Sequence, residues 1–386
     1  MRATILKIPV DHSRSPHIDS LRFILAMWVV ITHMVPWVLT IQKQAAIPIA
    51  LTSVMNWLTS LFQANGETHP AVVGFIILSG YCIHRSGLRS YRDDIVSYAV
   101  RRFFRIYPVF FIATIFGVAA FLVGFAINSA AVPSVSGTFS ISAVHVVEKL
   151  VALEAINPNG YFSSIQGNGP LQTVAVEMWL YAAYPAALLL IDRWSERAWW
   201  LLMFICWSAS IAINTYVPEW RPWSYNSSLI AFLPFWWLGA KFADKRFAAK
   251  LKRFIVAPAL VWLLISFDHA WGGQVAQLLA AIRQVAFAMC FACLVSSLDA
   301  LRNTPDNAVS ELGAAGYSIY AFHAPIVYTA VLLGAPWWLI VAIVIVAGLV
   351  SFRFLETPMI RRGKLVAAKF RTSSEPAMQS AITPKR

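Results

Sequence analysis

The stretch LRFILAMWVVITHM, residues 21–34, is an apolar run that carries an arginine near its start and a histidine near its end. In an α-helix the steps from Arg22 to His33 turn the chain about 20° past three full turns and cover roughly 16 Å along the axis. Both side chains therefore lie on one face. The stretch predicts a membrane helix that carries a guanidinium and an imidazole on a common face.

The composition of the whole chain is typical of a membrane protein. Of the 386 residues, 59% are hydrophobic and 13% are charged, and the mean hydropathy is +0.63, whereas a soluble domain carries about 25% charged residues. The net charge of +13 does not indicate nucleic-acid binding, because the basic residues form short clusters between apolar runs. We predict no cleavable signal peptide and expect the first apolar run to serve as a start-transfer anchor.

The apolar segments predict an all-α, polytopic membrane bundle of about ten transmembrane helices. The expected spans are 20–40, 69–84, 104–127, 170–191, 198–216, 226–242, 254–269, 275–298, 312–333 and 336–355. We predict one membrane domain over 1–362 and a basic, disordered cytoplasmic tail over 363–386. The long loop 41–68 contains a candidate interfacial or re-entrant helix, and the long loop 128–169 contains a mildly amphipathic candidate helix. Loops of that length often carry function, and disorder is the alternative.

The distribution of basic residues predicts the orientation of the bundle. With the N-terminus in the cytoplasm, 27 of the 31 Lys and Arg fall in inner segments and three, Lys43, Lys149 and Arg221, fall in outer loops. Arg283 lies inside an expected helix. Basic residues concentrate on the cytoplasmic side of membrane proteins, so we expect both termini to be cytoplasmic.

The cysteines do not predict a metal site. All four, Cys82, Cys206, Cys290 and Cys293, fall in apolar runs. Cys290 and Cys293 are spaced as C-x2-C, but they lie inside an expected helix and have no second ligand pair nearby. We therefore expect four buried, reduced thiols and no bound metal.

Three ionisable residues within expected helices indicate a functional site, because such groups are costly in a membrane. They are His33, Glu177 and His323, with Arg283 as a fourth case that is harder to interpret. Two polar stripes at helical spacing accompany them: Thr173, Glu177, Tyr181 and Tyr184 form one, and Tyr317, Tyr320 and His323 form the other. Facing stripes of this kind can enclose a polar cavity inside the bundle.

The inner segment YAVRRFFRIYP contains three arginines, Arg101, Arg102 and Arg105, interleaved with aromatic residues. Guanidinium groups bind phosphates through paired hydrogen bonds, and aromatic rings offer a stacking surface. A phosphorylated cytoplasmic ligand is one interpretation of this cluster. Contact with lipid headgroups is the other.

Five stretches together resemble the acyltransferase-3 family of integral membrane O-acyltransferases, which acylate surface polysaccharides and lipo-oligosaccharides. They are Arg22 to His33, the ILSGYCI element with Ser79, the arginine stretch Arg101 to Pro108, the helix from Leu171 to Tyr181 around Glu177, and Tyr317 to Pro325. The resemblance covers about residues 18–362. Gln172, Met178, Trp179 and Thr357 depart from the family's usual residues, which leaves the identity of the acceptor open.

The resemblance implies an enzyme of the bacterial inner membrane that takes an acyl group, with acetyl as the expected one, from cytoplasmic acyl-CoA to a glycan or glycolipid hydroxyl. It implies that Arg22 and the three clustered arginines bind the donor, and that His33 is either a general base or a transient acyl carrier. Glu177 would either orient His33 or stabilise its imidazolium form. His323, Tyr320, Tyr317, Ser79 and Tyr181 are expected to bind the acceptor or to support the site, and Ser79 is expected to shape its helix rather than to attack.

A polytopic transporter is the alternative function. In that case His and Glu side chains inside the membrane would relay protons, and the arginines would recognise an anion. A transporter of this kind predicts inverted sequence halves and indifference to acyl-CoA. We find no inverted halves in the sequence.

Overall fold

The computed structural model describes residues 15–42, 52–54, 68–86, 94–127, 143–162, 168–267, 273–301 and 304–382. Every regular element in these ranges is helical. The helices are α1 (Pro16–Ile41), α3 (Pro70–Ser86), α4 (Ile95–Ile127), α6 (Ala143–Leu150), α7 (Pro158–Phe162), α8 (Leu171–Arg193), α9 (Glu196–Tyr216), α10 (Arg221–Asn226), α11 (Leu229–Phe242), α12 (Lys245–Lys252), α13 (Val256–Phe267), α14 (Gly273–Ala300), α15 (Ala308–Ala314), α16 (Gly316–Leu332), α17 (Trp337–Ser351) and α18 (Thr357–Ile382).

A helix lies at each of the ten predicted spans, and six helical stretches are long and apolar enough to cross a membrane. These stretches are Pro16–Leu39, Ile95–Gly124, Leu171–Arg193, Glu196–Tyr216, Gln274–Ala300 and Trp337–Phe370. The helices at the other four predicted spans, α3, α11, α13 and α16, are shorter, with 17, 14, 12 and 17 residues. A helix needs about 20 residues to span the hydrocarbon core. The structure therefore confirms an all-helical, multi-pass membrane protein, and the count of ten crossings stays a prediction.

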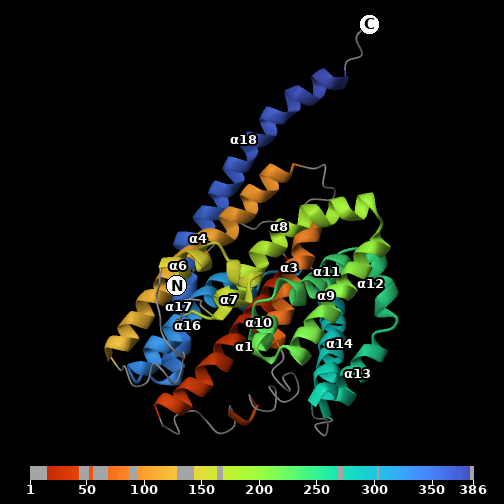
Figure 1. Cartoon of the computed structure of the whole chain (residues 1–386). Helices are drawn as coiled ribbons and strands as arrows, with labels where there is room; N and C mark the ends of the chain where they lie inside the picture. The colour runs from red at the N-terminus through yellow and green to blue at the C-terminus, as the bar shows by residue number, and fades with distance from the viewer. Residues whose placement is uncertain are drawn as a thin grey trace.

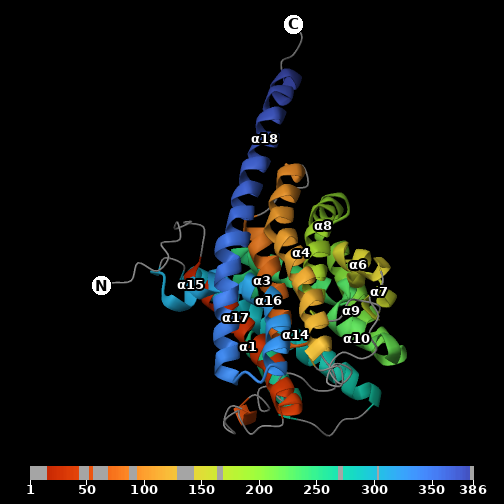
Figure 2. The same cartoon turned by 90° about the vertical axis from the view of Figure 1, so that its left-hand side faces the viewer.

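The helices pack into one bundle from which α18 and the first part of α4 project together (Figures 1 and 2). These two helices pack against each other, and the Ser97 hydroxyl donates to the Ala367 carbonyl at 2.9 Å. The predicted tail begins inside α18, which continues as a helix to Ile382. Ala, Lys and Met favour helix in this region, so the composition that suggested disorder is also compatible with a helix.

Small residues allow α3 and α11 to approach at backbone distance. A Cβ atom at Gly80 would lie 1.9 Å from the Trp236 carbonyl oxygen, and one at Gly239 would lie 2.1 Å from the Ile77 carbonyl oxygen. Close helix packing through small residues is the usual mode of association inside membranes. Gly80, in the ILSGYCI element, thus holds α3 against α11.

Two of the predicted spans are not single, regular α-helices. The span 312–333 is divided into α15 and α16 at Ala315, and Gly313 of α15 contacts the backbone of Asp19 in α1. The span 336–355 does not end in a loop: α17 passes through a π-helical turn, Phe352–Glu356, into α18. Single π turns of this kind occur frequently at functional sites.

The segment Ala143–Phe162 packs against the middle of α8. The Trp179 indole donates to the Ala152 carbonyl at 2.9 Å, and the Trp223 indole donates to the Glu154 carbonyl at 2.8 Å. Lys149 and Glu154 form an ion pair at 2.7 Å, and both side chains are almost fully buried. The helix predicted within 41–68 lies mostly outside the described residues.

Candidate active site

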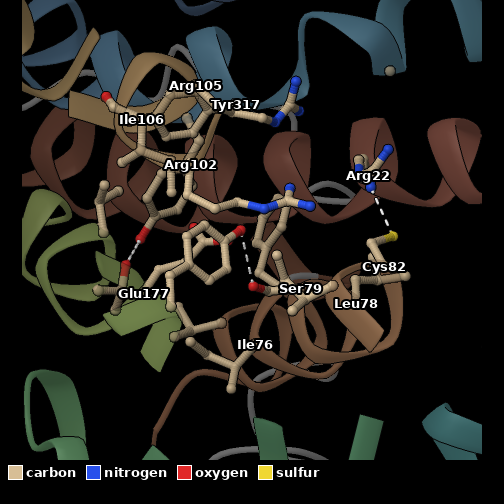
Figure 3. A pocket seen from close by; sticks show the side chains of 18 of the residues that line it. Arg22, Ile76, Leu78, Ser79, Cys82, Arg102, Arg105, Ile106, Glu177 and Tyr317 are labelled. Atoms are coloured by element: carbon tan, nitrogen blue, oxygen red, sulfur yellow. Dashed lines mark hydrogen bonds between the residues drawn. The ribbon is translucent and has the colours of Figure 1, made fainter. Parts of the chain in front are cut away.

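A pocket of about 110 Å³ lies where α1, α3, α4, α8, α15 and α16 meet. Its polar lining comprises Arg22, Ser79, Cys82, Arg102, Arg105, Thr173, Glu177, Tyr181, Tyr317 and Tyr320. Figure 3 shows Arg22 and Cys82 on one side, Arg102 extending across, and Glu177 on the opposite side. Eight of the eleven site residues predicted from the sequence therefore line one pocket.

Arg22 is held at the mouth of the pocket by partners from two helices. Its Nη1 atom donates to Asp19 Oδ1 at 2.5 Å, and its Nη2 atom donates to Cys82 Sγ at 3.0 Å. The first residue of α16, Gly316, faces the Arg22 side chain so closely that a Cβ atom there would lie 3.3 Å from Arg22 Cβ. The guanidinium is thereby fixed beside the pocket, at the end of α1 predicted to be cytoplasmic.

The arginine cluster of α4 is divided between two faces of that helix. Arg102 and Arg105 line the pocket, whereas Arg101 is not part of the lining. Arg101 lies on the same helical stripe as Ser97 and Phe104, and both of these residues contact α18. The Arg102 guanidinium lies over the rings of Tyr98 and Tyr181, at 5.5 and 5.7 Å from their centroids. Cation–π contacts of this kind hold the charge in position.

Glu356 supports Arg105 and was not predicted from the sequence. It lies in the π turn with no exposed surface, accepts a hydrogen bond from the Ser318 hydroxyl at 2.7 Å, and is 3.5 Å from Arg105 Nη1. The pair connects α4, α16 and the π turn. In the sequence, Glu356 is followed by Thr357 and Pro358. Only the three-dimensional structure shows that its carboxylate lies beside Arg105.

A directed chain of hydrogen bonds ends at Glu177. The Trp236 indole donates to Ser79 Oγ at 3.2 Å, the Ser79 hydroxyl donates to the Tyr181 hydroxyl at 3.2 Å, and the Tyr181 hydroxyl donates to Glu177 Oε1 at 2.5 Å. Each hydroxyl in the chain donates toward the carboxylate, so the groups polarise one another. The Ser79 proton is committed to Tyr181, which agrees with a supporting role for this serine.

The inner end of the pocket is closed by Tyr320. Its hydroxyl donates to the Pro170 carbonyl at 3.0 Å and is 2.5 Å from Thr173 Oγ1, and its ring contacts Phe75 at a centroid distance of 5.3 Å. On its other side the Tyr320 ring lies 5.5 Å from the His323 ring. Tyr320 therefore separates the arginine-lined pocket from the histidines. Tyr317 donates to the Ile106 carbonyl at 2.9 Å and holds α16 to α4.

His33 and His323 lie beside each other beyond the pocket. Their ring centroids are 5.3 Å apart, and His323 is fully buried. His323 Nδ1 is 2.6 Å from the Tyr320 carbonyl; a carbonyl only accepts, so Nδ1 carries the proton and Nε2 is the basic nitrogen. That nitrogen is buried and has no hydrogen-bond partner among the residues that the structure describes. The predicted pairing of Glu177 with His33 is replaced by this arrangement, in which Glu177 accepts from Tyr181 and His33 contacts His323.

A third histidine near this pair was missed by the sequence analysis. His69 directly precedes α3. Its Nε2 atom is 3.1 Å from Thr32 Oγ1, and its ring centroid is 5.3 Å from that of Trp28. The Ala71 backbone N–H donates to His69 Nδ1 at 3.2 Å, so Nε2 carries the proton and donates to Thr32. His33 is close enough to interact electrostatically with both His69 and His323. Only the position of His69 at the start of an apolar run could have indicated it.

The described residues contain no group of three or more His, Cys, Asp or Glu side chains placed to hold a metal ion. All four cysteines are free thiols, but Cys293 is buried whereas Cys82, Cys206 and Cys290 are only partly buried, so the expectation of four buried thiols is wrong for three of them. Arg283 is buried in α14 beside Trp262 and Gln284, in a small cavity separate from the pocket. The polar groups that line the pocket or lie next to it are arginines, hydroxyls, carboxylates and imidazoles.

The fold and the pocket define a multi-pass membrane protein with an arginine-lined pocket and a histidine pair beyond it. The chain belongs to the Acyl_transf_3 family, whose acyltransferase-domain model matches residues 16–353. Nodulation protein 10 of Rhizobium leguminosarum bv. viciae is 23% identical over 346 residues, which cover 85% of this chain and 92% of the relative. No solved structure gives a significant match. The protein is therefore a membrane acyltransferase, which confirms the resemblance inferred from the five motifs.

Proposed function

We propose that the protein is an O-acyltransferase of the bacterial inner membrane that takes an acyl group from cytoplasmic acyl-CoA and transfers it to a hydroxyl of a cell-envelope or exported glycan. The observation that carries this proposal is the pocket itself. It begins among Arg22, Arg102 and Arg105 and ends at Tyr320, one ring contact away from His323. A donor with a phosphorylated head and a reactive tail matches that order of groups.

The arginines are suited to the phosphates of CoA. Arg22 and Cys82 lie at the ends of α1 and α3 that are predicted to be cytoplasmic, and Arg102 and Arg105 lie in the first part of α4. Arginine binds phosphate oxygens through paired, charge-assisted hydrogen bonds. Glu177 and Thr173 lie deeper and offer oxygens that can accept from amide N–H groups, which the pantetheine arm of CoA contains. The negative charge of Glu177 would keep the phosphates near the arginines.

The histidine pair is suited to the transfer step. His33 would take the proton from the acceptor hydroxyl while its oxygen attacks the thioester carbonyl; the C–S bond then breaks, and the proton passes to the departing CoA thiolate. In a second route His33 Nε2 attacks the thioester carbonyl and the C–S bond breaks, while the proton on the other ring nitrogen passes to the CoA thiolate. The acceptor oxygen then attacks the acyl-imidazole, the C–N bond breaks, and the hydroxyl proton returns to the imidazole. The His33 ring lies against Trp37 and His323, and either route would use one of its ring nitrogens.

CoA release tests the proposal. Purified protein in lipid nanodiscs would be given acetyl-CoA, with and without envelope glycans from the host, and free thiol would be followed. We expect glycan-dependent release in the wild type, a loss of about 10² or more in His33→Ala, and no loss in the matched control His145→Ala, which lies on α6 away from the pocket. Succinyl-CoA and longer acyl-CoA donors would define the acyl group.

The two routes differ in a second measurement. Acyl transfer through His33 predicts a burst of CoA equal to the enzyme concentration when glycan is omitted, and an acyl group bound to the protein. A general base predicts neither. If no acyl-CoA is turned over or bound, the acyl-CoA proposal fails, and proton-coupled transport by His33, Glu177 and His323 would be tested next.

A further inference from the structure

The inner end of the arginine-lined pocket is mainly apolar. It is formed by side chains of α3, α8 and α16, namely Val72, Phe75, Ile76, Thr173, Val174 and Tyr320. The two hydroxyls in this set are already engaged: Tyr320 donates to the Pro170 carbonyl, and its oxygen is 2.5 Å from Thr173 Oγ1. A ligand that reaches this end therefore meets apolar side chains and two hydroxyls that are bonded to protein atoms.

Two aromatic rings close this end. The Phe75 and Tyr320 rings meet edge to face, with centroids 5.3 Å apart and an interplanar angle of 62°. Phe75 is partly buried and packs against two hydrophobic clusters, the second of which consists mainly of residues of α1, α16 and α17. On the far side of Tyr320 lies His323, at a centroid distance of 5.5 Å. The Phe75–Tyr320 pair thus stands between the pocket and the histidine pair.

The charge next to this end is negative. Glu177 lines the pocket one helical turn from Thr173 on α8, and it is close enough to Tyr320 to interact electrostatically with its hydroxyl. A second negative charge placed at the inner end would be repelled by this carboxylate, and it would lose its hydration against the apolar lining.

The arginines lie nearer the mouth. Cys82, which accepts from Arg22, is two helical turns from Phe75 along α3, or about 10 Å. The Arg102 guanidinium lies over the ring of Tyr181, which is one turn farther along α8 than the carboxylate of Glu177. The pocket therefore changes from cationic at the mouth to apolar at the inner end.

This gradient fixes the direction in which the proposed donor would lie. With the phosphates of CoA at the arginines, the acyl group is the leading end of the molecule, ahead of the thioester carbonyl. The acyl group then has to pass the two rings before the carbonyl can reach His33. We propose that the Phe75–Tyr320 pair selects the donor by the size and charge of its acyl group, with Phe75 as the specificity-determining residue. A short, uncharged acyl group passes, and a longer or carboxylate-bearing one is rejected. This inference rests on the function proposed above.

The experiment measures donor selectivity in nanodiscs with the envelope glycan fraction as acceptor. The kcat/KM values for acetyl-, butyryl-, hexanoyl- and succinyl-CoA would be compared in the wild type, Phe75→Ala, Phe75→Leu and the matched control Phe322→Ala. Phe322 is also partly buried and packs against the same two clusters, but it does not line the pocket. Each ratio of two donors is taken within one variant, so a partial loss of folded protein cancels.

We expect the wild type to use butyryl-CoA about tenfold or more less efficiently than acetyl-CoA, because a few methylene groups suffice for discrimination of that size. Phe75→Ala should raise the butyryl-to-acetyl ratio by about tenfold, Phe75→Leu should raise it less, and Phe322→Ala should leave it unchanged. Succinyl-CoA should remain a poor donor in both Phe75 variants, and Glu177→Gln should raise the succinyl-to-acetyl ratio. The affinity for CoA itself should stay within about twofold in the Phe75 variants, because the contacts to its phosphates are retained.

Three results would overturn the inference alone. They are equal use of acetyl-CoA and hexanoyl-CoA by the wild type, equal use of acetyl-CoA and succinyl-CoA, and a butyryl-to-acetyl ratio that changes alike in Phe75→Ala and Phe322→Ala. The absence of glycan-dependent CoA release with every donor would overturn the proposed function, and the inference would fall with it. That result is distinguishable, because it would be seen in the wild type and would not depend on the acyl group.

Discussion

The imidazole rings of His33 and His323 lie 5.3 Å apart, on α1 and α16, and the basic nitrogen of His323 is buried without a hydrogen-bond partner in the described ranges of the chain. The Nδ1 proton of His323 is held by the Tyr320 carbonyl. His323 can therefore accept a hydrogen bond from His33 or from the acceptor but cannot donate one through Nε2. In the proposed reaction this pair would take the place that a carboxylate and a histidine occupy in hydrolytic triads.

The pair predicts unequal effects of two substitutions at position 323. His323→Phe keeps a ring of similar breadth in the cavity but removes Nε2, and we expect glycan-dependent CoA release to fall by about 10-fold or more because His33 and the acceptor lose that acceptor atom. His323→Gln retains a side-chain oxygen and should keep more activity than the Phe variant. CoA affinity, measured by calorimetry, should stay within about twofold in both. Equal activity in the wild type and in His323→Phe would contradict a role in transfer.

Because Arg102 lines the pocket and Arg101 faces α18, we expect substitutions at these two positions to change CoA affinity by different amounts. Arg102→Gln should weaken CoA binding by about tenfold or more, because a charge-assisted contact to phosphate contributes about 1.5–3 kcal/mol. Arg101→Gln, one residue away on the stripe that faces α18, should change CoA affinity by less than about twofold. The dissociation constants of both variants for CoA and for dephospho-CoA would check this. A larger loss in Arg101→Gln would place the phosphates outside the pocket.

The sequence predicted the elements of this site because each follows from local periodicity. The 3.6-residue repeat puts Arg22 and His33 on one face of α1, and that face does contact α15 and α16. The same repeat placed Thr173, Glu177 and Tyr181 on one side of α8, and all three line the pocket. The length of the apolar segments and the positions of the basic residues predicted a membrane protein for the same reason. The bilayer requires a minimum apolar length of each spanning segment and favours basic residues in each cytoplasmic loop, so both can be recognised segment by segment.

What the sequence did not predict depends on contacts between distant segments. Glu356 acts on Arg105 only because a π turn rotates it toward α4. The buried Asn168 amide donates to the Ala321 carbonyl of α16, which is open because Pro325, four residues later, has no N–H. Arg101 was grouped with its neighbours because spacing cannot tell which face of α4 meets α18. The partner of His33 was assigned to Glu177 by chemical analogy, whereas the crossing of α1 with α16 determines that it is His323.

Cys82 offers a chemical test of where the donor binds. Its sulfur accepts from Arg22 and lines the pocket, whereas the other three cysteines are not part of the lining. We expect N-ethylmaleimide to modify Cys82 and to block CoA binding, because the adduct would occupy the arginine-lined mouth. Prior addition of CoA should slow this labelling, which mass spectrometry of the Cys82 peptide would show. A Cys82→Ala variant should keep CoA binding after the same treatment; inactivation of that variant would mean that another thiol is responsible.

The buried ion pair of Lys149 and Glu154 predicts how the segment Ala143–Phe162 is held. The two side chains are 2% and 1% exposed, and burial raises the pKa of Glu154 while the Lys149 ammonium opposes that shift. Lys149→Met leaves a buried carboxylate alone and should lower the free energy of unfolding by about 3 kcal/mol or more near pH 7. The double variant Lys149→Met/Glu154→Gln removes both charges and should recover much of that loss.

The same variant should show a defined pH dependence. A carboxyl group whose pKa is raised in the folded state destabilises that state above its unfolded pKa, and the penalty disappears as the pH falls and the group takes up its proton. Measured against the double variant, which has no carboxyl group at position 154, the stability deficit of Lys149→Met should therefore shrink between pH 7 and pH 5. Thermal unfolding of the two purified variants across this pH range would measure that deficit. A deficit in Lys149→Met that is independent of pH would show that Glu154 is not buried as a charge, and that the segment is held by its indole hydrogen bonds from Trp179 and Trp223 instead.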